Sequence, residues 1–128
     1  MDFTLKTILE ASPAEVYKAW LSSEGHTNMT GGKAIASDKV EAKFTSWDGY
    51  IFGKNILLEQ DQRIIQTWRS LQFNDNEEDS ILEIILNQKD DKTELILIHT
   101  NLPENGENYE AGWDEHYFQP MKMYFSRK

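Results

Sequence analysis

The chain has 128 residues and a formal net charge of −9, from 13 lysines and arginines against 22 acidic residues. The length suits a single domain over residues 1–128, and a hydrophobic share of 39% excludes a disordered chain. The lack of cysteine excludes disulfides and thiolate metal sites. The basic residues are scattered, which argues against nucleic acid or an anionic membrane as partner. The sequence has neither a membrane-length apolar run nor a basic leader, so we expect a cytoplasmic monomer or weak dimer.

The first part of the chain is expected to form a strand and two short helices. Apolar and polar residues alternate over residues 2–9, which predicts a strand with one buried face. The segment from Ser12 to Glu15 is a capping box with proline at the first helical position, so a helix starts there. A second short helix is expected to start at Ser22 and to end before Gly31-Gly32.

The middle of the chain has the pattern of antiparallel strands separated by turn-forming residues such as Asp48-Gly49 and Asp90-Asp91. Strands are expected over residues 33–37, 39–46, 50–58, 63–71, 80–87 and 93–100. The last two strands carry isoleucines on the face opposite to their other apolar residues, namely Ile81, Ile85, Ile96 and Ile98. Either both faces of these strands are covered, or the outer face leaves an apolar surface for a partner.

A long helix is expected over residues 107–125, with an apolar stripe at Tyr109, Trp113, Tyr117, Met121 and Tyr124. Pro120 lies inside it and predicts a kink, because proline lacks a backbone donor. Gly112 costs ~1 kcal/mol in a helix, which predicts close backbone packing at that turn. Such an aromatic helix needs a concave apolar surface, and the curved antiparallel sheet is the only candidate.

The sequence contains no recognisable phosphate-binding loop, nucleophile elbow or paired metal-ligand spacing, so we expect no metal and no cofactor. Two histidines have two interpretations. His99 and His116 are either buried polar groups satisfied by hydrogen bonds, or polar contacts inside an apolar cavity. The large aromatic residues suit a core or a ligand cage; they are Trp20, Trp47, Trp68, Trp113 and Tyr117.

Five motifs in order carry a family resemblance. They are the segment from Ala11 to Trp20, Gly31-Gly32, Asp48-Gly49 with Phe52-Gly53, Gln66 to Arg69, and Gly112-Trp113 followed by residues 117–125. This order resembles the family named for the C-terminal domain of the activator of heat-shock protein 90 ATPase, within the START-like (SRPBCC, birch-pollen-allergen-like) superfamily. The resemblance implies an α+β helix-grip fold: a curved antiparallel sheet of about six to seven strands around a long C-terminal helix, with two short helices after the first strand.

The same resemblance implies a cavity between sheet and helix that binds a small apolar ligand without catalysis. The candidate lining residues are Trp20, Trp68, Leu82, Ile84, Leu97, His99, Trp113, His116 and Tyr117. The alternative is a protein-interaction module that regulates a heat-shock chaperone ATPase, as a co-chaperone. An enzyme is a third hypothesis, because some superfamily members are cyclases or hydrolases, but no grouped acid, base and nucleophile is evident here.

In the eukaryotic activators the family domain follows a separate chaperone-binding domain. This sequence starts at its first expected strand. Ligand binding is therefore the expected function ahead of direct ATPase activation.

Overall fold

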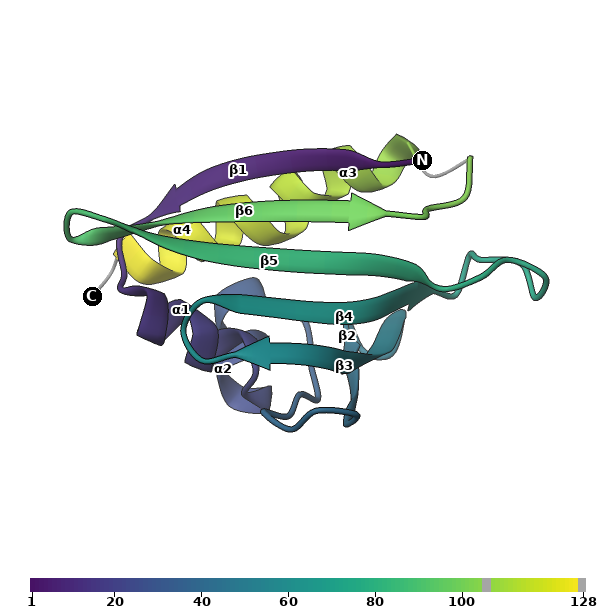
Figure 1. Ribbon diagram of the computed structural model, residues 1–128, viewed down its shortest axis with the longest axis horizontal. Helices are drawn as coiled ribbons and strands as arrows, with labels where there is room; N and C mark the ends of the chain where they lie inside the picture. The colour runs from purple at the N-terminus through teal and green to yellow at the C-terminus, as the bar shows by residue number, and fades with distance from the viewer. Residues whose placement is uncertain (105–106, 127–128) are drawn as a thin grey trace.

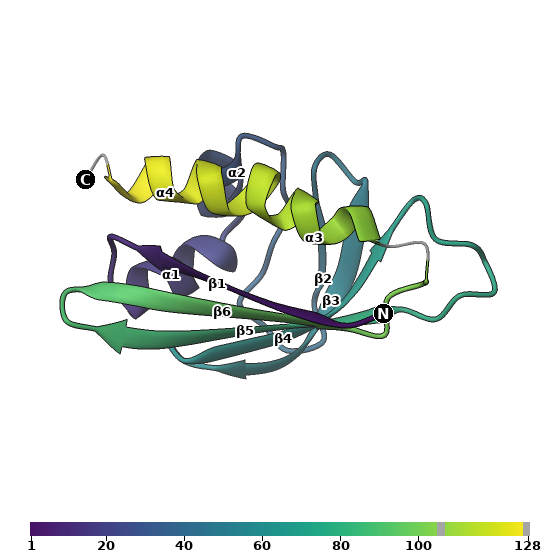
Figure 2. The same ribbon diagram turned by 90° about the horizontal axis from the view of Figure 1, so that it is seen from above.

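The computed structural model describes residues 1–104 and 107–126. Its elements, in chain order, are β1 (Phe3–Leu9), α1 (Pro13–Trp20), α2 (Ser23–Thr30), β2 (Lys43–Ser46), β3 (Ile51–Glu59), β4 (Arg63–Ser70), β5 (Ser80–Lys89), β6 (Lys92–Thr100), α3 (Glu107–Trp113), the π-helical turn η1 (Asp114–Phe118) and α4 (Gln119–Ser126). The strands form one antiparallel sheet in the order β1-β6-β5-β4-β3-β2. The helices lie on one face of this curved sheet (Figures 1 and 2), which confirms the helix-grip fold.

Both short helices start as their sequences predict, and the second also ends as predicted. The Ser12 hydroxyl accepts a hydrogen bond from the Glu15 amide at 3.2 Å, and the Glu15 carboxylate accepts one from the Ser12 amide at 3.1 Å. The second helix ends at Gly31, which adopts the left-handed conformation with φ 88° that favours glycine. These local signals fix where the chain leaves β1 and returns toward the sheet.

The segment before β2 differs from the prediction. The expected strand over residues 33–37 forms only an isolated bridge between Ile35 and Thr45, and the next expected strand starts at Lys43. The reason lies in α2, whose hydroxyl groups take the neighbouring backbone donors. The Ala34 amide donates to Thr27 Oγ1 and the Ala36 amide to Ser23 Oγ, each at 2.9 Å, so this segment is held to α2 rather than paired along a strand.

The C-terminal helix, composed of α3, η1 and α4, runs across the concave face of the sheet (Figure 2). The disturbance expected at Pro120 takes the form of the π-helical turn that ends just before it. There the Gln119 amide donates to the Asp114 carbonyl, five residues back. This wider turn accommodates the proline within the helix.

A chain of hydrogen bonds, here called the helix–sheet chain, joins the C-terminal helix to the sheet. The Trp113 indole donates to His99 Nδ1 at 3.0 Å, and the other His99 ring nitrogen lies 2.9 Å from Ser80 Oγ. Ser80 in turn donates to the Trp68 carbonyl at 2.7 Å. Because Nδ1 accepts, Nε2 carries the proton and donates to Ser80, so every polar atom of the chain is paired while His99 and Ser80 are fully buried.

At its β2–β3 end, the sheet turns up toward the C-terminal helix (Figure 2). Gly53 belongs to β3 and is paired with Phe44 of β2. A Cβ atom there would stand 1.9 Å from the Thr67 carbonyl oxygen and 2.9 Å from the Phe44 ring. The backbone of β4 and the Phe44 ring therefore occupy the space beside Gly53, and the concave wall at this end depends on the missing side chain.

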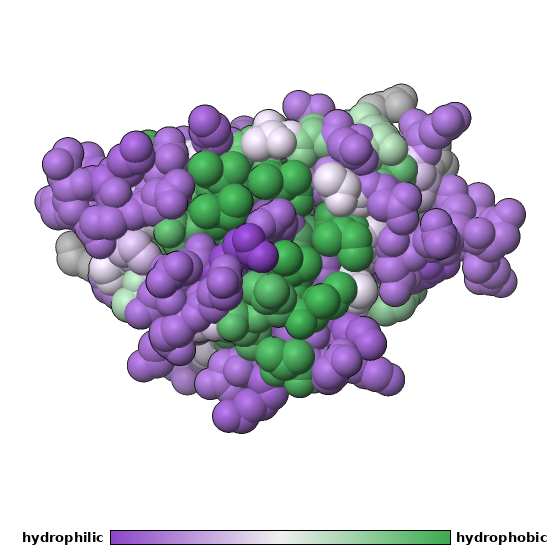
Figure 3. Space-filling view, viewed as in Figure 1, coloured by the Kyte–Doolittle hydropathy of each residue, from purple (hydrophilic) through white to green (hydrophobic). Residues whose placement is uncertain are grey.

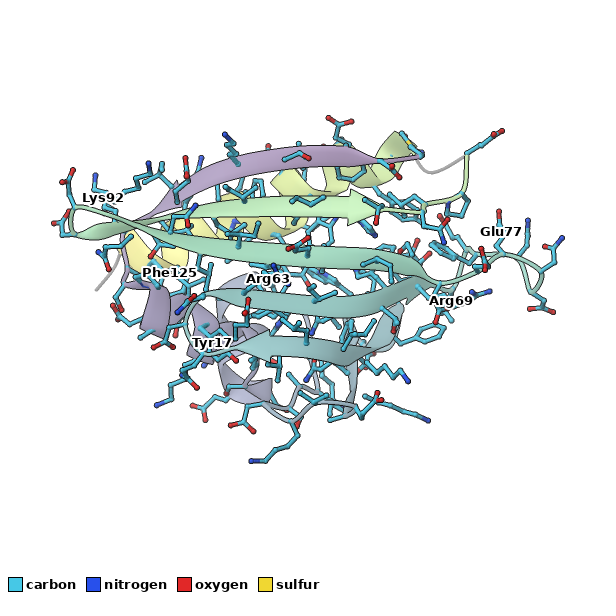
Figure 4. All side chains as sticks on the ribbon, viewed as in Figure 1. Tyr17, Arg63, Arg69, Glu77, Lys92 and Phe125 are labelled. Carbon is cyan, nitrogen blue, oxygen red and sulfur yellow. The ribbon has the colours of Figure 1, made fainter. Side chains whose placement is uncertain are left out.

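The outer face of the sheet carries an apolar surface that no described helix covers. This outer-face patch consists of Ile8, Ile65, Ile81, Ile85, Ile96 and Ile98, and Figure 3 shows it as green areas divided by polar residues. Arg63 lies on the same face (Figure 4) and pairs with Glu83 at 3.5 Å. Two alternatives were predicted for the last two strands: both faces covered, or an apolar outer face. The structure has the second, because no described helix covers their outer face.

Replacing His99 with glutamine tests whether the helix–sheet chain requires a neutral ring. Burial lowers the pKa of His99 to about 3, whereas an unfolded histidine takes up a proton below about pH 6.5. The free energy of unfolding should thus fall as the pH drops from about 6.5 toward 3, by up to about 1.4 kcal/mol per pH unit from this residue. Glutamine can accept from Trp113 and donate to Ser80 without titrating.

Urea unfolding between about pH 6.5 and pH 4.5 measures this contribution. We expect His99→Gln to lose less stability over that range than the wild type. Burial lowers the pKa of His26 as well, but His26 is present in both proteins and cancels in the comparison. Equal pH dependence of the two proteins would contradict a neutral His99.

Candidate ligand-binding pocket

A pocket with a volume of about 560 Å³ lies between the start of the C-terminal helix and the upturned end of the sheet. The residues that line it are Trp47, Tyr50, Ile51, Trp68, Gln72, Asn108, Tyr109, Gly112, Trp113, His116 and Tyr117. Trp68, Trp113 and Tyr117 are buried deep in the wall, whereas Gln72 and Asn108 are exposed. The pocket is thus open to solvent at one side and aromatic within.

The β2–β3 turn supplies one wall. Trp47 and Asp48 both adopt left-handed backbone conformations, with φ 51° and 58°, and Gly49 follows with φ 89°. The Trp47 ring lies directly against Gly32, because a Cβ atom on Gly32 would stand 2.3 Å from the ring. The glycine after α2 and the strained turn together hold the indole over the pocket.

The C-terminal helix supplies the opposite wall through Tyr109, Gly112 and Trp113. The Tyr109 hydroxyl lies 2.6 Å from Ser70 Oγ, which fixes the ring beside β4. The close packing expected at Gly112 is not found, since an added Cβ there would meet only the His116 ring, at 3.9 Å. The missing side chain faces the pocket and leaves space in it.

The deep end of the pocket joins a second buried hydrogen-bond system. His26 Nδ1 donates to the Trp20 carbonyl at 2.9 Å, so His26 Nε2 must accept from the Tyr117 hydroxyl at 2.8 Å. Burial raises the pKa of Tyr117 and lowers the pKa of His26. Both groups are therefore neutral, and this pair positions the Tyr117 ring rather than supplying a charge.

His116 lies at the entrance. Its side chain is 62% exposed, and its ring meets the Trp47 ring edge-on at a centroid distance of 5.5 Å. Nε2 of His116 is 4.0 Å from the Glu115 carboxylate. The imidazole is consequently a solvent-accessible group at the rim of the pocket.

The structure brings some of the predicted site residues to the pocket and leaves others in the core. Trp68, Trp113, His116 and Tyr117 line it. The other five candidates are buried away from its wall; they are Trp20, Leu82, Ile84, Leu97 and His99. His99 takes the hydrogen-bonded core role that was one of its two interpretations.

The sequence prediction omitted most of the rim. Trp47 was weighed as core or cage but not included, and the other omitted residues are Tyr50, Ile51, Gln72, Asn108, Tyr109 and Gly112. The sequence held a signal for three of these residues: Trp47 and Tyr50 flank the Asp48-Gly49 turn, and Tyr109 begins the aromatic stripe of the helix. The sequence pattern did not predict the upturn of the sheet, which brings the β2–β3 turn and the start of the C-terminal helix together.

Two further observations concern the described residues as a whole. None of their helices has the length and apolar character needed to cross a membrane. No group of three or more histidine and acidic side chains among them is placed to hold a metal ion.

Comparison with solved structures shows the same fold in several proteins. An HSP90 activator from Plasmodium falciparum matches with a TM-score of 0.87 at 21% identity, covering 96% of this chain and 94% of that one. The Aha1 dimer from Colwellia psychrerythraea matches with a TM-score of 0.82 at 12% identity, covering 98% and 96%. CalU16 from Micromonospora echinospora matches with a TM-score of 0.80 at 19% identity, covering 98% and 76%.

Sequence comparison places the chain in a family. No curated protein matches it significantly. The family described as activator of Hsp90 ATPase homolog 1-like protein matches residues 10–126, which include both walls of the pocket. The chain therefore belongs to the activator of Hsp90 ATPase homolog 1-like family.

Proposed function

We propose that this protein binds a small, largely apolar ligand in the pocket between the β2–β3 turn and the C-terminal helix. The observation that carries the proposal is the aromatic pocket of about 560 Å³. Ligand sites of drug-sized molecules are typically concave, mostly apolar and ~300–1,000 Å³ in volume. Family membership supports the proposal, because the family has a fold suited to ligand binding.

The chemistry of the wall favours binding over catalysis. Burial raises the pKa of Tyr109 and of Tyr117, so neither phenol ionises readily. His116 is the one imidazole among the lining residues that the structure describes, and it lies exposed at the rim. General acid–base catalysis needs a positioned acid and base within reach of one reacting group, and the described wall offers no such pair.

A pair of substitutions at Gly112 tests the pocket directly. Gly112→Leu places a branched side chain in the open space and should abolish ligand binding while keeping the helix, because leucine is a better helix former than glycine. Gly112→Ala is the matched control: it should stabilise the protein by up to ~1 kcal/mol but leave most of the pocket open.

The readout is the melting temperature over a concentration series of aromatic and polycyclic small molecules, with quenching of tryptophan fluorescence as a second measure. We expect at least one compound to stabilise the wild type and Gly112→Ala but not Gly112→Leu. A compound that stabilises all three proteins equally binds elsewhere. No stabilisation by any compound of a broad panel would refute the proposed function.

A second candidate function is regulation of a heat-shock protein 90 ATPase. It is favoured by the family match and by the structural similarity to the Plasmodium falciparum activator. The surface we assign to that contact is the outer-face patch, because it is an extended apolar surface that no described helix covers. Ile96 is central in this patch, opposite Ile85 on β5.

Two glutamate substitutions test this candidate. Ile96→Glu places a charge within the outer-face patch, whereas Val40→Glu makes the same kind of change at a 54% exposed valine in the loop before β2. If the candidate is correct, wild type and Val40→Glu change the ATP turnover of heat-shock protein 90 at saturating concentration, and Ile96→Glu does so several-fold less. Turnover that the wild type leaves unchanged would eliminate this function.

A further inference from the structure

The wall of the pocket is aromatic rather than aliphatic. Its described members include six aromatic side chains, namely Trp47, Tyr50, Trp68, Tyr109, Trp113 and Tyr117, against one aliphatic side chain, Ile51. Aromatic rings have electron-rich faces that attract cations, and tryptophan does so most strongly. An aromatic enclosure can therefore select a ligand by charge as well as by shape.

The basic residues near the pocket do not face it. No lysine or arginine lines it among the residues that the structure describes. Arg69, next to Trp68 in the chain, is held at the end of the sheet beside Glu77 (Figure 4), where it donates to the carbonyls of Glu77 and Asn74 at 2.7 Å each. Lys33, whose carbonyl accepts from the Asp48 amide, is exposed and is not part of the wall.

The charged residues adjacent in sequence to the wall are predominantly acidic. Asp48 follows Trp47, Glu110 follows Tyr109, and Asp114 and Glu115 separate Trp113 from His116; all four are exposed. The pKa of Tyr109 is raised chiefly by burial, with the Tyr50 and Glu77 side chains adding to the effect. An anion that enters the pocket would lose hydration without gaining a positive partner.

We propose that the ligand of this pocket is an organic cation, a hydrophobic amine or quaternary ammonium compound, held by its positive group against the aromatic wall. This inference rests on the proposed function of the pocket and specifies the class of ligand. The exposed Gln72, Asn108 and His116 at the entrance provide hydrogen-bonding groups for a polar part of the same molecule.

Three probes that share one aromatic body test the charge preference. They are (biphenyl-4-ylmethyl)trimethylammonium as cation, biphenyl-4-ylmethanol as uncharged compound and biphenyl-4-acetate as anion. Binding is measured by titration calorimetry at moderate salt, which screens the general attraction of a cation to an acidic protein. The titrations are performed at about pH 8, where the carboxylic acid of the anionic probe is fully ionised.

The cation should bind about tenfold more tightly than the alcohol, and the carboxylate should bind most weakly. Gly112→Leu, which keeps the net charge, should abolish binding of all three probes. Trp47→Leu should weaken binding of the cation about fivefold and of the alcohol much less, while Trp47→Phe should restore most of the cation binding.

The outcomes separate the two proposals. If the alcohol or the carboxylate binds as tightly as the cation and Gly112→Leu abolishes that binding, the pocket is a ligand site and the cation inference is wrong. If the cation binds equally well to Gly112→Leu, it occupies the acidic surface, and the inference is wrong. If none of the three probes binds, the cation inference fails, whereas the proposed function itself is decided by the broader panel.

Discussion

The hydrogen bond from the Trp113 indole to the buried His99 ring is the interaction that fixes the C-terminal helix on the sheet. An aromatic helix could slide on an apolar surface, since hydrophobic contact has little directionality. The helix–sheet chain removes that freedom, because shifting the helix would leave Trp113 Nε1 and His99 Nδ1 unpaired in a buried site. Once Trp113 is fixed, the turn before it lies over the upturned end of the sheet and the turn after it brings Tyr117 to His26.

The pocket results from the absence of a side chain on the C-terminal helix at Gly112. Gly112 presents no side chain to the space between helix and β2–β3 turn. The π-helical turn that follows contains Tyr117 and Phe118, which are adjacent in sequence and both buried. His116, in the same turn, lies on the exposed side, where it contacts the Trp47 ring. Local departures from a regular helix thus create a hollow beside a well-packed core.

The order of elements could be predicted because each had a local signal: the capping box at Ser12, the alternation in the strands, and the aromatic stripe of the last helix. The structure of residues 33–37 could not be predicted, because the amides of Ala34 and Ala36 donate to Thr27 and Ser23, a contact that depends on how α2 packs. The position of the pocket was missed for a similar reason. Leu82, Ile84 and Leu97 point inward as predicted, but their part of the concave face is filled by the core. Gly112 was noted, yet the sequence did not show whether the missing side chain serves close packing or an open space.

The residues that hold the fold and those that shape the pocket share four members of the buried wall, namely Ile51, Trp68, Trp113 and Tyr117, whereas the rim is a separate set. His99 and Ser80 are hydrogen-bonded to Trp113 and Trp68 and do not line the pocket, whereas most of the rim comes from the β2–β3 turn and the first turns of α3. Changes at the rim therefore need not disturb the helix–sheet chain, which is consistent with nearly the same fold at 12% to 21% identity in the solved relatives. It follows that the ligand of one such protein says little about the ligand of another. For this chain, the preference for ligand charge has to be derived from its own wall, which is rich in aromatic rings and has no lysine or arginine among the residues that the structure describes.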